Sequence, residues 1–546
     1  MATCGEQLVR LLEAYGVNFV FGIPGVHTVE LYRGLSASRI RHVTPRHEQG
    51  AGFMADGYAR ASGKPGVCFV VTGPGMTNVL TAMGQAYADS IPMLVVSSVN
   101  RTEQLGMGEG RLHELPSQSR LVSGVSAFSH TLLHPDQLSQ VMARTFAIFS
   151  SARPRPVHIE IPIDVIAGQA NELVVGLRAI PKRPGPRPHD VERAARLLCE
   201  ARKPIIILGG GAVDAAEPAR SLAEDLDAPV VNTINAKGLL PPGHRLRAGE
   251  NMAFEPIRQA IAAADVVLAV GTEFGETEMY PQPKDVRITG VLIRIDIDPE
   301  QLVRTQTADL PIVSDAGLAL DAIAADVAIL RNSDAKAIPT GSVGIDSPGA
   351  RRAAAIRTET VKHWWPAVFL HQKIAGHVSE VLPDAIVVGD QTEPVYALNQ
   401  CFEPKRARSY FNSSTGYGTL GYALPAGIGA KLAAPDRPVV VLAGDGGLQF
   451  SISELASAIE AKTPLVLLLW NNEGYGEIKT YMQELGITPI GVDLFTPDFV
   501  AIAHGFGWRT SQPRSFVELA ESLVQAASAS LPTLIELRAD APFLHY

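Results

Sequence analysis

The sequence contains little cysteine, no excess of basic residues and no long apolar run, and each shortage excludes a class of protein. Its 546 residues include four cysteines that lie far apart, so neither a disulfide framework nor a cysteine metal site is expected. Lysine and arginine number 47 against 56 acidic residues, and the net charge of −9 disfavours nucleic acid and acidic membranes as partners. The longest apolar runs, such as residues 464–470, fall well short of the roughly 20 residues that a membrane span requires. We therefore expect a cytoplasmic protein with no nucleic acid and no membrane among its partners.

Short apolar runs alternate with helical patterns along the whole chain, which predicts an α/β fold with mainly parallel sheets. The first helix is expected over residues 3–16, where Thr3 and Glu6 have the spacing of a capping box. These residues do not have the pattern of a signal peptide. The expected buried strands are residues 67–72, 93–97, 205–208, 266–270, 291–295, 439–442 and 465–469.

Two stretches rich in polar residues, proline or glycine lack periodicity and predict linkers, at residues 171–189 and 333–351. They divide the chain into three expected doubly wound domains, which are residues 1–170, 190–332 and 352–546.

The most informative motif is Gly444-Asp445-Gly446, which the 24 residues 447–470 separate from Asn471-Asn472. Each half follows an expected strand, so both should lie on loops at the edge where parallel sheets bind ligands. A carboxylate and an amide oxygen suit magnesium, and Gly446 and Gly447 allow backbone N–H groups to approach a phosphate. Gly-Asp-Gly alone would be an ordinary turn; the spacing and the strand placement favour a site.

This constellation resembles the cofactor motif of thiamine diphosphate-dependent enzymes, in the branch of acetolactate synthases, benzaldehyde lyases and 2-oxo acid decarboxylases. The resemblance covers essentially the whole chain, in the order pyrimidine-binding, central and diphosphate-binding domain. It implies that Asp445, the Asn472 side chain and the Gly474 carbonyl hold Mg²⁺ against the diphosphate of thiamine diphosphate, beside Gly446 and Gly447.

Further segments resemble other parts of the same site. Residues 46–60 are similar to the segment that carries the activating glutamate, which implies that Glu48 contacts the aminopyrimidine and promotes loss of the C2 proton. Residues 416–426 are similar to the segment beneath the cofactor, where the Gly418 carbonyl would accept from the 4′-amino group and Leu420 would enforce a bent cofactor. Loops that match the family near the pyrimidine or the diphosphate contain Pro24, Asn78, Asp390, Gln391 and Thr392.

Two histidines depart from the acetolactate synthase pattern. His113 stands where that family has a glutamine, and His27, in Gly25-Val26-His27, is similar to a histidine of benzaldehyde lyase. Two imidazoles near the reacting carbon would suit proton transfer at neutral pH. Either histidine could instead be a loop residue bonded to backbone.

After Asn472 the chain carries Glu477 and Tyr481, where acetolactate synthases usually have a methionine and a tryptophan. A carboxylate in a pocket for small apolar groups suggests a cationic substrate tail, and a guanidinium would fit it well. Glu477 could also be a proton donor or point to solvent.

In the central domain, Glu273 stands where flavin-binding relatives have an arginine. Because a carboxylate would repel the diphosphate of a flavin, we expect no tightly bound FAD.

The sequence therefore predicts a thiamine diphosphate- and Mg²⁺-dependent lyase that decarboxylates a 2-oxo acid. Its loops look most like those of 5-guanidino-2-oxopentanoate (2-ketoarginine) decarboxylases. An acetolactate synthase-type carboligase is the alternative, followed by an FAD-linked oxidase. In this branch the pyrimidine domain of one subunit faces the diphosphate domain of another, which implies a homodimer or homotetramer with active sites at the interface.

Overall fold

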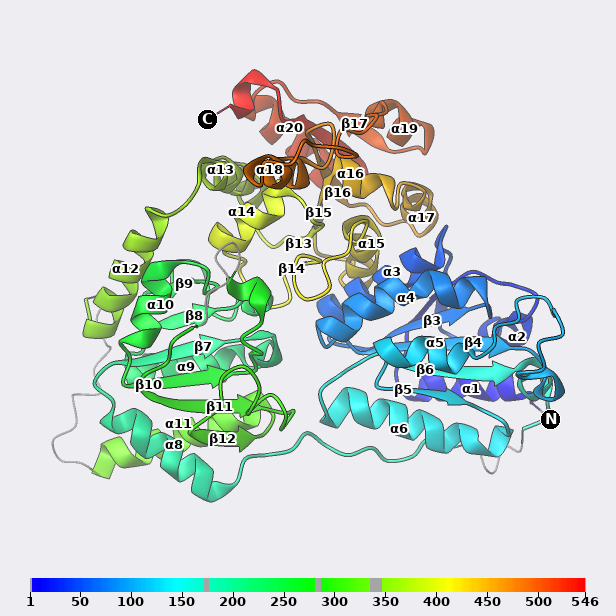
Figure 1. The fold of residues 1–546 in the computed structure, drawn as a ribbon, viewed down its shortest axis with the longest axis horizontal. Helices are drawn as coiled ribbons and strands as arrows, with labels where there is room; N and C mark the ends of the chain where they lie inside the picture. Colours follow the sequence, from blue (N-terminus) through cyan, green and yellow to red (C-terminus); the bar gives the residue numbers. More distant parts are fainter. Residues whose placement is uncertain (1, 171–175, 280–285, 334–345, 546) are drawn as a thin grey trace. The chain divides into compact units, whose positions relative to one another are not determined.

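The structure, a computed structural model, describes residues 2–170, 176–279, 286–333 and 346–545. It contains three six-stranded sheets whose strand pairs are parallel, so the predicted α/β fold is confirmed (Figure 1). All seven predicted strands are present, each within two residues of its expected bounds. Among the described residues, no helix is both long and apolar enough to cross a membrane.

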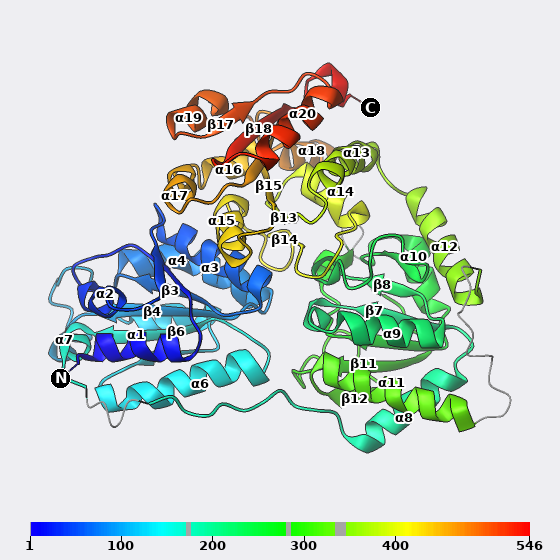
Figure 2. The ribbon, with the colours of Figure 1, turned by 180° about the vertical axis from the view of Figure 1, so that it is seen from behind.

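The first sheet has the order β2-β1-β3-β4-β6-β5 and carries helices on both faces. Its strands are β1 (Phe19–Gly22), β2 (Arg41–Val43), β3 (Gly66–Val70), β4 (Met93–Val99), β5 (Phe128–Thr131) and β6 (Val157–Pro162). Helices α1 (Cys4–Ala14) and α6 (Leu138–Ser151) cover one face, while α3 (Glu48–Ser62) and α4 (Pro74–Ala88) cover the other, as Figure 1 and Figure 2 show from opposite sides. The short helices are α2 (Val29–Leu35), α5 (Gln118–Val122) and α7 (Ile163–Ala167).

The predicted capping box is present at the start of α1. The Thr3 hydroxyl accepts from the Glu6 backbone N–H at 3.2 Å, and the Glu6 carboxylate accepts from the Thr3 N–H at 2.7 Å. These bonds satisfy two donors that the first helical turn leaves without intrahelical partners.

The second sheet has the order β12-β11-β10-β7-β8-β9. Its strands are β7 (Pro204–Leu208), β8 (Val230–Asn232), β9 (Arg247–Glu250), β10 (Val266–Val270), β11 (Val291–Asp296) and β12 (Leu310–Val313). Alternate strand residues face opposite sides: Ile206 packs with α8 (Pro188–Glu200), α9 (Ala216–Leu226) and α11 (Ala316–Ser333), and Ile207 packs with α10 (Glu255–Ala262) and α12 (Pro348–Val361).

The third sheet has the order β14-β13-β15-β16-β18-β17. Its strands are β13 (Ile386–Gly389), β14 (Tyr410–Asn412), β15 (Val439–Gly444), β16 (Val466–Asn471), β17 (Arg509–Ser511) and β18 (Thr533–Arg538). The helices that follow α12 along the chain are α13 (Pro366–Val381), α14 (Glu393–Cys401), α15 (Ala423–Ala433), α16 (Asp445–Gln449), α17 (Glu454–Glu460), α18 (Gly476–Glu484), α19 (Phe499–Gly505) and α20 (Phe516–Ala527).

The chain forms two compact units. One runs from the N-terminal region to Lys182 and also contains Glu380–Val395 and Asn412–His545, and the other contains Arg183–Ser379 and Tyr396–Phe411. In the first unit α3 packs against α15, where a Cβ atom on Gly57 would lie 2.0 Å from the Ala426 carbonyl oxygen, so only glycine allows this approach. The predicted linkers 171–189 and 333–351 lie partly outside the described residues, and α8 and α12 begin within their last few positions.

Candidate cofactor and active site

The two halves of the Gly-Asp-Gly and Asn-Asn motif meet at one edge of the third sheet. Strands β15 and β16 pair in parallel with Gly444 opposite Trp470, so Asp445 and Asn472 follow neighbouring strand ends. Asp445 begins α16 and is 1% exposed, and burial raises the pKa of its carboxyl group. Its Oδ2 atom is buried without a hydrogen-bond partner among the described residues, which leaves a carboxylate oxygen available to a ligand.

Three oxygen atoms converge at this edge. The Asn472 side-chain oxygen lies 3.0 Å from Asp445 Oδ1 and 2.9 Å from the Gly474 carbonyl oxygen. Two arrangements satisfy such a cluster: rotation of the amide, so that Nδ2 donates to both oxygens, or a cation bound among the three. In the described part of the chain no three His, Cys, Asp or Glu side chains gather as metal ligands, so a cation here would use one carboxylate with amide and backbone oxygens. That oxygen set suits Mg²⁺.

The predicted diphosphate residues surround the start of α16. A Cβ atom on Gly447 would lie 3.2 Å from the Asp390 carboxylate, and one on Gly444 would lie 2.9 Å from Thr392 Oγ1. The Asp390 carboxylate accepts from the backbone N–H groups of Gln391 and Gly421 at 2.8 and 2.9 Å. Burial raises the pKa of Asp390 to about 6, although these donors oppose the shift.

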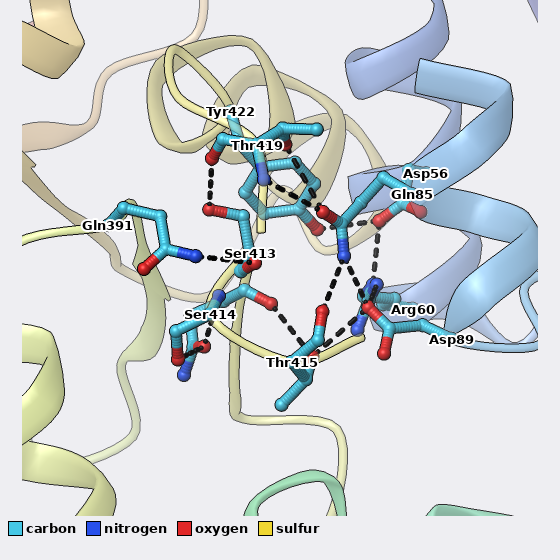
Figure 3. A network of polar contacts seen from close by, with 11 residues as sticks. Asp56, Arg60, Gln85, Asp89, Gln391, Ser413, Ser414, Thr415, Thr419 and Tyr422 are labelled. Atoms are coloured by element: carbon cyan, nitrogen blue, oxygen red, sulfur yellow. Dashed lines mark hydrogen bonds and ion pairs between the residues drawn. The ribbon is translucent and has the colours of Figure 1, made fainter. Parts of the chain in front are cut away.

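The loop that contains Gly418 and Leu420 follows β14 and precedes α15. Gly418 has a φ of +75°, and a Cβ atom there would lie 2.9 Å from the Gln391 side-chain nitrogen, so both conformation and space favour glycine. Gln391 donates to the Ser413 carbonyl at 3.3 Å, as Figure 3 shows. Leu420 is half-buried beside this turn. The structure thus brings the predicted residues of the third sheet together.

Glu48 is the first residue of α3, and its side chain is 9% exposed. Its Oε2 atom accepts from Asn78 Nδ2 at 2.9 Å, so two predicted site residues from different helices meet. Pro24 lies exposed on the loop after β1.

His27 and His113 also meet, with ring centroids 5.2 Å apart. The Nδ1 atom of each ring is buried and has no partner among the described residues. Burial, with a contribution from the neighbouring His113, lowers the pKa of His27, so this imidazole is neutral at pH 7. His113 has a φ of +61°, a strained conformation for a residue other than glycine.

Glu477 lies exposed in the first turn of α18. Within the described residues, no hydrogen bond, ion pair or ring contact joins Glu48, His27 or His113 to Asp445, Asn472 or Gly474. The predicted residues therefore form separate clusters in one chain: the pairs Glu48–Asn78 and His27–His113 beside the first sheet, and the residues around Asp445 at the edge of the third sheet.

Sequence reasoning missed three buried polar residues beside these clusters: Gln85, Gln118 and Glu454. The Gln118 amide accepts from Thr72 Oγ1 and the Gly73 N–H, at the turn that opens α4. Glu454 accepts from the Arg46 backbone N–H just before α3. A lone glutamine or glutamate in a helical pattern carries no sequence signal of burial, because such side chains usually face solvent.

Comparison with known proteins agrees with this arrangement. Three family models match: "Thiamine pyrophosphate enzyme, N-terminal TPP binding domain" over residues 2–121, the central domain over residues 191–323, and the C-terminal TPP binding domain over residues 391–537.

Similar whole proteins come from bacteria and archaea. A Pseudomonas aeruginosa protein named "Probable 2-ketoarginine decarboxylase AruI" is 47% identical over 98% of this chain and 94% of its own length. The acetolactate synthase isozyme 1 large subunit of Escherichia coli is 31% identical over 99% of this chain and 94% of its own. A "Probable acetolactate synthase large subunit" of Methanocaldococcus jannaschii is 30% identical over 98% of this chain and 91% of its own. The chain therefore belongs to the thiamine pyrophosphate enzymes and is an enzyme that depends on thiamine diphosphate.

Proposed function

We propose that this enzyme decarboxylates a 2-oxo acid non-oxidatively, and that its substrate carries a cationic tail, with 5-guanidino-2-oxopentanoate as the leading candidate. The observation that carries the proposal is the 47% identity, over nearly the whole chain, to a protein named as a probable 2-ketoarginine decarboxylase. The histidine pair and Glu477 support it, because such a reaction on such a substrate calls for proton-transfer groups and a negative charge.

Bound thiamine diphosphate supplies an electron sink for the carbanion that loss of carbon dioxide leaves. Glu48 would hydrogen-bond to the aminopyrimidine, and the Asn78 amide fixes the orientation of this carboxylate. The Gly418 carbonyl and Leu420 would hold the ring system from the third sheet.

Magnesium fits the oxygen cluster at the carboxyl edge of β15 and β16. Asp445, with its unpartnered Oδ2, the Asn472 side chain and the Gly474 carbonyl would hold the ion. Backbone N–H groups of Gly446 and Gly447, in the first turn of α16, would face the diphosphate beside Asp390, Gln391 and Thr392. Pro24 would line the pyrimidine side.

His27 and His113 would hold and deliver the proton that releases the aldehyde. A neutral imidazole can donate from one ring nitrogen and accept at the other, and the lowered pKa of His27 keeps it in that form at pH 7. Their paired, partly buried rings favour short proton transfers between the two side chains.

Carboligation is the second candidate, favoured by the 30–31% identity to acetolactate synthases over nearly the whole chain. In that reaction a second carbonyl compound, rather than a proton, would react with the carbanion.

We propose that the enzyme carries no tightly bound FAD, because Glu273 follows β10 on an exposed loop and would repel a diphosphate there.

We also propose a homodimer or homotetramer in which Glu48 of one subunit and Asp445 of another complete each site. Within the described part of one chain, no bond joins Glu48 to Asp445 or Asn472, and this separation supports the arrangement.

Product analysis tests the reaction. The enzyme loaded with thiamine diphosphate and Mg²⁺ would receive pyruvate or 5-guanidino-2-oxopentanoate in separate reactions. We expect carbon dioxide and 4-guanidinobutanal from the second alone; acetolactate from pyruvate, with the guanidino acid untouched, would establish the carboligase.

Substitution of Glu477 tests the substrate tail. Glu477→Gln should raise KM for the guanidino acid by about tenfold or more, since a hydrogen bond to a charged group contributes about 1.5–3 kcal/mol. Glu484→Gln is the matched control, because it removes the same charge from the exposed surface of the same helix, about 10 Å further along. An equal rise in KM in both variants, or in Glu477→Gln for every 2-oxo acid, would mean that Glu477 does not recognise the substrate tail.

A further inference from the structure

A buried polar network joins the helices of the first sheet to the loop that carries Gly418 (Figure 3). On α3, Arg60 Nε donates to Asp56 Oδ1 at 2.6 Å, and its guanidinium also donates to Asp89 Oδ2 at 2.6 Å. The Tyr422 hydroxyl, from the far end of the loop, donates to Asp56 Oδ1 at 2.5 Å. The network therefore fixes the loop to charged groups that cannot move without exposing buried charge.

Gln85, on α4, is the member of this network that contacts both ends of the loop. Its Nε2 atom donates to the Thr415 carbonyl at 3.0 Å and to Asp89 Oδ2 at 2.6 Å. Its Oε1 atom accepts from Thr419, whose Oγ1 and backbone N lie at 3.2 and 3.4 Å. The Gln85 side chain is fully buried, so each bond that it loses leaves a buried group unpartnered.

The residues between these two anchors are exposed to solvent. Gly416, Tyr417 and Gly418 are exposed, while Thr415 and Thr419 are buried. Gly416 and Gly418 both have positive φ, at +66° and +75°, so the turn has no helix or strand to hold its shape. Its shape depends on the anchors at its two ends.

Gln85 also shares a helix with the other half of the site. Asn78, which holds Glu48, lies seven residues earlier on α4, and residues i and i+7 lie on the same face about 10 Å apart. One face of α4 therefore contacts both the carboxylate at the start of α3 and the loop of the third sheet.

We propose that Gln85 is a positioning residue of the cofactor site, which holds the Gly418 carbonyl and Leu420 in the geometry that keeps bound thiamine diphosphate reactive. The inference rests on the roles proposed above for Gly418 and Leu420. It does not depend on which 2-oxo acid is used or on the fate of the carbanion.

The test measures exchange of the cofactor C2 proton with deuterium oxide, in enzyme saturated with thiamine diphosphate and Mg²⁺ and without substrate. Gln85→Leu keeps the side-chain size and removes all four bonds. We expect exchange to slow by about tenfold or more, since a misplacement of about 1 Å costs up to about a hundredfold in rate. The dissociation constant for thiamine diphosphate should change less than about threefold, because the diphosphate contacts stay intact. Exchange within about twofold of the unsubstituted enzyme would overturn the proposal.

A double-mutant cycle shows whether Gln85 acts through the loop. Thr419→Val removes the hydroxyl that donates to Gln85 and should slow exchange, whereas the double variant should be no slower than Gln85→Leu alone, because coupled residues are not additive. If the factors by which the two single variants slow exchange multiply in the double variant, Gln85 does not act through Thr419 and the proposal is overturned. If Gln85→Leu does not fold, Thr419→Val provides the test instead, because it leaves the Gln85 side chain in place. Unaltered exchange in Thr419→Val would then overturn the proposal.

Two reference variants separate other causes. Thr145→Val removes a buried hydroxyl that donates only within α6, to the Val141 carbonyl, and should leave exchange unchanged. If this variant slowed exchange as much as Gln85→Leu, the effect would be general destabilisation and the proposal would fall. Glu48→Gln should abolish exchange; if it does not, the proposed role of Glu48 fails, independently of the result for Gln85.

Discussion

Asp390 is a fully buried carboxyl group for which backbone donors offset only part of the cost of burial. Burial raises the pKa of Asp390 from 3.8 to about 6. Below pH 3.8 the group is protonated in both the folded and the unfolded chain. Between pH 3.8 and 6 the unfolded chain loses this proton first, so the stability that the group contributes is lost as the pH rises through about 6.

We expect Asp390→Asn to remove this dependence. The free energy of unfolding of the unsubstituted apoenzyme, relative to that of the variant, should fall by about 2.4 kcal/mol between pH 4 and pH 7. Urea unfolding of both proteins across this range measures the difference. A difference that stays constant with pH would mean that Asp390 keeps an ordinary pKa in the folded protein.

Among single residues, the sequence predicted those whose role follows from neighbouring sequence. It missed those whose role depends on contacts with residues far away in the chain. Asp445 and Asn472 follow strands that apolar runs make visible, and parallel pairing brings them together. The bond from Gln85 to the Thr415 carbonyl joins residues 330 positions apart, and nothing near Gln85 marks it as buried. Whether Glu477 faces a substrate likewise depends on atoms outside its own helix.

The start of helix α3 is held by another helix. Glu454, on α17, is 1% exposed, and its Oε1 atom accepts from the backbone N–H groups of Arg46 and His47 at 3.0 and 3.1 Å. The Ser457 hydroxyl donates to the second carboxylate oxygen at 2.6 Å. These N–H groups lie just before Glu48, where a helix begins without intrahelical partners and where negative charge is favourable. Glu454 therefore fixes the position from which the Glu48 side chain extends.

Loss of the Glu454 charge should weaken both stability and catalysis. We expect Glu454→Gln to lower the free energy of unfolding by about 1–3 kcal/mol, because a charged, buried acceptor is replaced. It should lower kcat more than it changes KM, since Glu48 would be displaced while Glu477, proposed to bind the substrate tail, stays in place.

Glu460→Gln is the control on the same helix. Glu460 contacts the Arg46 side chain at the surface instead of its backbone, and exposed ion pairs contribute about 0–1 kcal/mol. Urea unfolding and steady-state kinetics compare the two variants. If both variants lose equally little stability and activity, Glu454 does not hold the start of α3.

Elements differ in how far the sequence reveals them. The seven predicted strands are buried apolar runs, and all were found. Other strands were not predicted, interior ones such as β13 and β18 among them; the edge strands β2 and β17 have only three residues each and no continuous apolar pattern. Helix α8 begins at Pro188, inside the predicted linker 171–189, because proline is well suited to the first turn of a helix.

At the scale of the whole molecule, three sheets were predicted and the described residues form three, but the sequence could not show that the first and third share one compact unit. That association depends on the contact of α3 with α15, which needs the absence of a side chain at Gly57. Yet each cluster of site residues remains on its own sheet, Glu48 with Asn78 on one side and Asp445 with Asn472 on the other.

This separation leads to a prediction about mixed oligomers. Glu48→Gln and Asp445→Asn should each be inactive alone, the first through cofactor activation and the second through Mg²⁺ binding. If each site combines Glu48 of one subunit with Asp445 of its partner, a mixed dimer retains one site with both native residues. Random mixing of the two variants should then restore about a quarter of the unsubstituted specific activity, since half of the dimers are mixed and each has one working site. Mixed dimers isolated through two different affinity tags would be assayed directly. Inactive mixed dimers would mean that Glu48 and Asp445 of the same chain act together, so the active site would not be shared between subunits.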